Sequence, residues 1–144
     1  MEEIYKSIMA RIQSTVPEIK WIDLDTGQLE FYNERPSVAF PSVLIDIEIT
    51  QCQDLYQGVQ LCNAIIGIRV AQNLQTGRTS NVTPKNVRQT GLQRYQLVED
   101  VYRSLQSWES GIFNPLSRTN QKKEIRKDGL FVCRIDFTTM FKDN

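Results

Sequence analysis

The chain has 144 residues, and its 17 basic side chains balance 17 acidic ones, so its formal net charge is zero. Apolar residues make up 40% of it and charged residues 24%, which excludes a disordered chain and is typical of a globular protein. A chain of this length can bury a core without disulfides or metal. We therefore expect a single domain over residues 1–144.

The residues after Met1 are acidic and amphipathic, so we expect no signal peptide. The longest apolar run, residues 64–68, is far shorter than the ~20 residues of a membrane span. The cysteines Cys52, Cys62 and Cys133 are sparse and contain no CxxC pair, which favours reduced thiols, although Cys52 and Cys62 could lie opposite each other in a hairpin. A cytosolic protein is expected.

The charges are sorted along the chain. Residues 1–54 carry ten acids and four bases, whereas residues 55–98 carry five bases and no acid. The remainder is nearly balanced. A neutral chain with one acidic and one basic segment can be complementary to another copy of itself.

The first predicted element is a helix over about residues 2–16. Apolar residues recur at every fourth position from Ile4 to Val16, and Pro17 ends the helix. Two short strands are expected to follow, at residues 19–25 and 29–32, joined by a turn at Thr26-Gly27.

A long hairpin is predicted over about residues 42–72. Its strands cover residues 42–50 and 59–72, and residues 53–58 connect them. Alternation places Val43, Ile45, Ile47 and Ile49 on one face of the first strand, and Asp46, Glu48 and Thr50 on the other.

A polar loop is expected over about residues 73–91, and loops of this length are usually functional or disordered. A second helix is predicted over about residues 92–108, with Gly111 just past its end. Its apolar stripe is Leu92, Tyr95, Val98, Tyr102, Leu105 and Trp108.

The last predicted element is a hairpin over about residues 117–141. Its strands, 117–127 and 130–141, are joined by a two-residue turn at Asp128-Gly129. The first strand is strongly basic and is expected at a sheet edge. The whole pattern predicts an α+β fold, in which two helices pack on one face of an antiparallel, possibly mixed, sheet of about four to six strands.

Catalytic chemistry has little support. The chain has no histidine and no glycine-rich phosphate loop. The carboxylates of Asp46 and Glu48, or of Asp23 and Asp25, could hold a divalent ion, but the solvated face of a strand is the preferred interpretation. The basic strand contains no aromatic residue, so an acidic protein is favoured over nucleic acid as its partner. We expect no enzyme activity, cofactor, metal or membrane contact.

The order of the elements resembles that of the tail-terminator, or tail-completion, proteins of long-tailed bacteriophages. The likeness rests on the amphipathic helix from Ile4 to Val16, the entry Phe40-Pro41-Ser42-Val43 into a long strand, and the closing strand 129–137. It also includes the strand 58–70, the polar loop and the helix 95–108.

This resemblance implies a ring, usually a hexamer, that caps the finished tail tube and joins it to the head connector. It implies a place in the virion, assembled in the host bacterial cytoplasm, and no catalytic residues. The long loop 73–91 and the early strands depart from the pattern, which leaves a head-completion or neck protein open.

A head-to-tail ring joins two different surfaces that must complement each other. We predict that the assembly contacts pair a basic set of residues with an acidic set. The basic set is Arg78, Lys85, Arg88, Arg118, Lys122, Lys123, Arg126 and Lys127, and the acidic set is Asp23, Asp25, Asp46 and Glu48.

Two other functions stay open at this point. The chain could be a standalone protein-binding module, such as an adaptor or immunity protein, that uses the basic edge strand. It could also be an enzyme with a carboxylate–metal site at Asp46 and Glu48. Flanking genes for portal, capsid and tail-tube proteins would favour the virion function.

Overall fold

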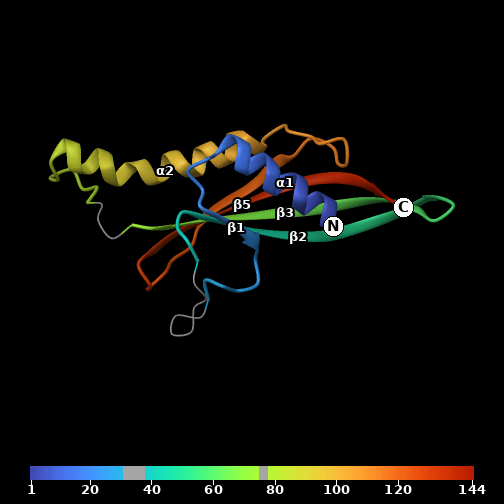
Figure 1. Ribbon diagram of the computed structural model, residues 1–144, viewed down its shortest axis with the longest axis horizontal. Helices are drawn as coiled ribbons and strands as arrows, with labels where there is room; N and C mark the ends of the chain where they lie inside the picture. Colours follow the sequence, from blue (N-terminus) through green and yellow to red (C-terminus); the bar gives the residue numbers. More distant parts are fainter. Residues whose placement is uncertain (31–37, 75–77) are drawn as a thin grey trace.

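A computed structural model of the chain describes residues 1–30, 38–74 and 78–144. In these residues two helices lie over one face of a sheet of five strands, which confirms the predicted α+β class (Figure 1). The elements are α1 (Glu2–Thr15), β1 (Trp21–Leu24), β2 (Ser42–Tyr56), β3 (Val59–Asn73), α2 (Lys85–Leu105), β4 (Ser117–Lys123) and β5 (Leu130–Asp143).

The sheet has the strand order β1-β2-β3-β5-β4. β1 is parallel to β2, and the other neighbours are antiparallel, so the sheet is mixed. The predicted pairing of the first two short strands is wrong in the described part, because Leu29 and Glu30 form a turn; residues 31–32 lie outside the described residues. Gln28 closes this turn by donating from its side-chain amide to the Leu24 carbonyl.

The predicted β2–β3 hairpin is confirmed, but its first strand continues to Tyr56 instead of ending at residue 50. Pairing continues through Cys52 and Cys62 almost to the tip, where Gln57 and Gly58 form a two-residue turn with φ values of 46° and 80°. Two positive φ values give the turn type that matches the twist of paired strands. The end of the hairpin therefore projects beyond both helices as a narrow arm (Figure 1).

The main core lies between the helices and the sheet. The predicted stripe of α1 is confirmed, since Ile4, Ile8 and Ile12 are buried there together with Val101 of α2 and Ile66 of β3. Each such side chain contributes roughly 1.5–3 kcal/mol when it leaves water. We call this side of the sheet the helix face.

A smaller apolar cluster lies on the opposite side of the sheet. It consists of Leu29, Leu44, Ala71, Leu130 and Val132. Because side chains alternate along a strand, Leu44 points away from the helix face that holds its neighbours. The cluster fixes the segment after β1 against the sheet.

Helix α2 begins at Lys85, not at residue 92, so most of the second half of the predicted loop is helical. Pro84 precedes the first turn, and its carbonyl accepts the Arg88 amide at 2.9 Å. Pro84 is the N-cap residue, and its φ of −50° and ψ of 139° are extended, so the helical backbone begins at Lys85. Residues 75–77 of the predicted loop lie outside the described residues.

The other end and the buried face of α2 also differ from the prediction. The helix ends at Leu105, because Ser107 takes a positive φ of 62° and reverses the chain before Gly111. Val98 and Leu105 of the predicted stripe are buried, but Leu92 and Tyr95 are exposed. Leu97 and Val101, which were not in the predicted stripe, are buried. The sheet covers a face of the helix rotated from the predicted one.

The predicted edge position of the basic strand is confirmed, since β4 is the last strand and all its residues are exposed. The predicted two-residue turn is wrong. β4 ends at Lys123, and residues 124–129 form a loop before β5. The loop is held because Arg126 folds inward instead of continuing the strand.

Candidate functional site

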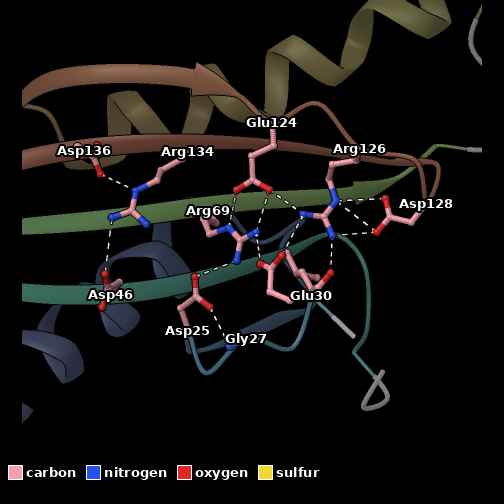
Figure 2. A network of polar contacts seen from close by, with 11 residues as sticks. Asp25, Gly27, Glu30, Asp46, Arg69, Glu124, Arg126, Asp128, Arg134 and Asp136 are labelled. Carbon is pink, nitrogen blue, oxygen red and sulfur yellow. Dashed lines mark hydrogen bonds and ion pairs between the residues drawn. The ribbon is translucent and has the colours of Figure 1, made fainter. Parts of the chain in front are cut away.

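The face of the sheet opposite the helices carries a network of ion pairs, and we call it the network face. Its centre is Arg69 of β3, whose side chain is only 7% exposed (Figure 2). The guanidinium of Arg69 contacts Asp25 at 3.1 Å, Glu30 at 2.6 Å and Glu124 at 2.7 Å. One cation in the middle strand thus binds carboxylates from two separate loops.

A second buried arginine extends the network. Arg126, with a 4% exposed side chain, contacts Glu124 at 2.7 Å and Asp128 at 2.8 Å. It also donates to the main-chain carbonyl of Leu29. Figure 2 shows Glu124 lying between the guanidinium groups of Arg69 and Arg126. The loops before β2 and before β5 are therefore cross-linked through their charges.

The network keeps its members charged. Burial by itself lowers the pKa of Arg69, but its hydrogen bonds to Glu124, Glu30 and Asp25 outweigh burial and raise that pKa. Burial likewise raises the pKa of Glu124, but hydrogen bonds from Arg69 and Arg126 lower it overall. Removing one partner would leave a charge with poor solvation, so the arrangement holds the loops in place.

A third arginine lies flat across the sheet. Arg134 of β5 donates from Nε to Asp136 at 2.8 Å, and its Nη2 lies 3.6 Å from the Asp46 carboxylate of β2. Gly67 of β3 lies between the two acids in the sheet register. A Cβ atom at Gly67 would be 2.3 Å from the Arg134 Nη2, so glycine is what permits this crossing.

The acidic residues of the predicted interface have different environments. Asp25 and Asp46 are engaged by Arg69 and Arg134 within the chain. Asp23 accepts the amide of Leu24. Glu48 is exposed on β2, and no ion pair to it occurs within the described residues. Glu48 is thus the acid most available to a partner.

The predicted basic residues fall into three groups. Arg78 lies in the segment before α2, and Lys85 and Arg88 lie in the first turn of α2, which overhangs the sheet (Figure 1). Arg126 is buried in the network. The remaining four, Arg118, Lys122, Lys123 and Lys127, are exposed on β4 or in the loop that follows it. Within the described ranges no ion pair joins the predicted basic set to the predicted acidic set.

Sequence reasoning did not single out Arg69, Arg134, Glu124 or Gly67. A signal for Arg69 was present, since it is a charged residue inside the otherwise apolar run Ile65 to Ala71. A charge in a buried strand normally has a partner. The partners come from distant loops, and no local spacing identifies them.

Both edges of the sheet are open over part of their length. β1 pairs with β2 only from Ser42 to Ile45, and in the described residues no strand flanks β2 on that side from Asp46 to Tyr56. The outer edge of β4 likewise has no neighbouring strand in the described part of the chain. Open edges present unpaired backbone groups that can bind another strand.

Each end of the molecule carries two of the exposed large apolar side chains. Tyr56, 63% exposed, and Leu55 lie at the tip of the hairpin arm. Val82 lies just before α2 and Val87 lies in its first turn, at the opposite end (Figure 1). Clusters of exposed apolar groups are typical of surfaces that contact other proteins.

Cys52 and Cys62 face each other across the arm, and their Sγ atoms lie 3.0 Å apart as free thiols. Cys62 donates a hydrogen bond to Cys52, and this bond, together with burial, raises the pKa of Cys62 to about 11. Among the described residues no group of three or more Cys, Asp and Glu side chains is placed to hold a metal ion. In the same residues neither helix is long and apolar enough to cross a membrane.

Comparison with known proteins gives a match in structure only. No protein-family model matches the chain, and no curated protein matches it. The fold is similar to that of a chain from the virion of a native gene transfer agent (GTA) particle, with a TM-score of 0.53 and 10% sequence identity. The match covers 94% of this chain and 84% of the other, so the two share a fold over nearly their whole lengths.

Proposed function

We propose that this chain is a structural virion protein that assembles into a ring, as a tail terminator or a head–tail joining component. In this proposal it acts in the virion after assembly in the host bacterial cytoplasm, and it performs no catalysis. Its partners are further copies of itself, the tail tube and the head connector.

The observation that carries the proposal is the fold shared with a chain of a gene transfer agent virion over 94% of this chain. The surface agrees with an assembly function. A ring subunit needs two different sides to contact its neighbours. It also needs two ends to contact the components above and below it. The open edges of β2 and β4 supply the sides, and the apolar arm tip and α2 start supply the ends.

A standalone binding module is the second candidate. The exposed basic strand β4 favours it, because an open edge with Arg118, Lys122 and Lys123 could pair with a strand of one acidic protein. Such a module would stay monomeric by itself. The oligomeric state therefore separates the two functions.

The test is electron microscopy of the purified chain, with its mass measured by light scattering at low and high salt. We expect closed rings with a central hole and a mass that is a fixed multiple of the monomer. A monomer at high concentration under both salt conditions, and also in the presence of tail tubes, would contradict the proposal.

A further inference from the structure

The two open edges of the sheet carry side chains of opposite charge. β4 presents Lys122 and Lys123 on its exposed surface, and the open part of β2 presents Glu48. These edges lie at opposite ends of the strand order, with β3 and β5 between them. An edge cannot pair with its counterpart in the same chain, but it can pair with that of a second copy.

The strand directions fit a closed ring. β2 is antiparallel to β3, β3 to β5 and β5 to β4, so β4 runs opposite to β2. When copies are related by rotation about an axis parallel to the strands, every strand has the same direction in all copies. β4 of one copy then meets β2 of the next as an antiparallel neighbour, and the sheet continues from copy to copy.

The free backbone groups define a register. The Glu124 amide binds the Val132 carbonyl of β5, so by alternation the amides and carbonyls of Gln121 and Lys123 point away from β5. On β2, the Ile45 carbonyl already accepts the Asp25 amide. The next outward-facing residues of β2 are therefore Ile47 and Ile49.

A register shift follows Ile49 on β2, and another lies between Arg118 and Asn120 on β4. Each edge thus offers two consecutive outward-facing positions between irregular or covered stretches. These four residues are Ile47 and Ile49 of β2 and Gln121 and Lys123 of β4. Antiparallel pairing uses the backbone groups of all four only when Lys123 faces Ile47 and Gln121 faces Ile49. This register places Lys122 directly opposite Glu48.

The side chains agree with this register. Lys122 pairs with Arg134 in the sheet, so it lies on the network face. Glu48 alternates with Asp46, which contacts Arg134, so it lies on the same face. Lys122 and Glu48 would form a non-hydrogen-bonded pair, in which side chains are closest and opposite charges attract.

The loop after β4 supplies a further match. Ile125 is 99% exposed, an unusual state for an isoleucine. In the inferred register Ile125 would be level with Ile45 of the next copy. A hollow of about 330 Å³ opens there, where β1 ends, and its apolar lining includes Tyr5, Leu24 and Ile47.

We propose that copies of this chain join head to tail by pairing the outer edge of β4 with the open edge of β2, with Lys122 opposite Glu48 and Ile125 in the hollow beside Ile45. This interface rests on the proposed ring function and specifies how the ring closes.

A disulfide across the interface tests the register. The variant Lys122→Cys/Glu48→Cys, in a Cys52→Ser background, is oxidised and run on a denaturing gel without reductant. Within one chain the two positions are three strand spacings apart, roughly 14 Å or more, beyond the ~7 Å between Cα atoms that a disulfide spans. Any cross-link is therefore between copies, and we expect a ladder of multimers.

Two controls make the result specific. The variant Asn120→Cys/Glu48→Cys, on the same face but two residues out of register, should cross-link at least about tenfold less, because its Cα atoms exceed disulfide reach. An equal mixture of the two single variants should give dimers and no larger species, since each copy then carries one half of the link.

Charge reversal gives a second measurement that does not depend on cysteines. Glu48→Lys alone and Lys122→Glu alone should each weaken association about tenfold or more at low salt, and the double exchange should recover most of the loss. Gln121→Pro removes an outward amide from β4 while leaving its bonds to β5 intact, and it should abolish association, whereas Gln121→Ala should not.

The outcomes separate the interface from the function. Rings seen by electron microscopy with no ladder, and with no effect of charge reversal, would overturn this interface and leave the ring function standing. Neither rings nor a ladder would contradict the proposed function itself.

Discussion

The two faces of β3 hold the molecule together in different ways. Toward the helices, Ile66 and Ile68 pack in an apolar core. On the network face, Arg69 forms ion pairs and Gly67 leaves room for the side chain of Arg134. The first face provides most of the free energy of folding through burial. The second positions the loops beside β1 and β4. The two faces of one strand thus have different roles: one contributes the apolar core, and the other positions the loops beside the sheet edges.

Removing a large side chain from the helix face should have the largest effect. Phe137 is fully buried in the main core, and Phe137→Ala should lower the free energy of unfolding by about 3–5 kcal/mol. Thr138→Ala, the next residue on the exposed side, should change it by about 0.5 kcal/mol or less. Urea denaturation of both variants measures the difference, and equal losses would contradict it.

Removing the central cation of the network face should cost somewhat less. Arg69→Met leaves Asp25 without its cation, and leaves Glu30 and Glu124 with Arg126 alone. We expect a loss of about 3 kcal/mol, at the low end for a broken buried ion pair because Glu30 is half exposed. The loops that carry the acidic partners of Arg69 should also exchange their amide hydrogens faster. Hydrogen exchange should rise near Asp25 and Glu124 but not in α1, and unchanged exchange there would refute the loop-holding role.

The network face should also respond to acid. The pKa of Glu124 in the folded state lies below its ordinary value of 4.5, so its ionisation stabilises the fold above that value. This contribution disappears as the pH falls through the lowered pKa. Thermal unfolding from pH 6 to pH 3 should show a smaller decline for Glu124→Gln than for the wild type. Parallel declines would assign the acid sensitivity to other groups.

The smallest effect is expected at Gly67. In Gly67→Ala the new Cβ displaces the guanidinium of Arg134, which is the mobile end of a long side chain, so the loss should be about 1 kcal/mol or less. In an Arg134→Ala background the same change should cost nothing. A double-mutant cycle with no coupling would show that Arg134 does not occupy this position.

The local parts of the fold were predictable because their signals are local. The four-residue period of α1 and the alternation in β2 and β3 each identify an element and its buried face. The start of α2 was missed because the segment from Lys85 to Thr90 lacks an apolar stripe and is helical mainly through its continuity with later turns.

Long-range choices were less predictable. β1 pairs with β2 in parallel. The segment after β1 packs through Leu29 on a small apolar cluster of the sheet. The strand with which β1 pairs is therefore decided by tertiary packing. Arg126 was predicted to belong to the basic edge strand, but it is drawn into the network by the distant Glu30 and by its sequence neighbours Glu124 and Asp128. Charge type was visible in the sequence, whereas the identity of each ion-pair partner depends on how loops fold over the sheet.

The two-residue turn at Gln57-Gly58 also affects how the chain reaches its folded state. It makes β2–β3 the most local strand pairing in the sheet, and such hairpins close within microseconds, before strands that need long loops. We expect the whole edge of β2 to exist before β1 docks. During that interval β1 and the β4 of another copy would compete for it, so fast docking of β1 should protect newly made chains from pairing out of register.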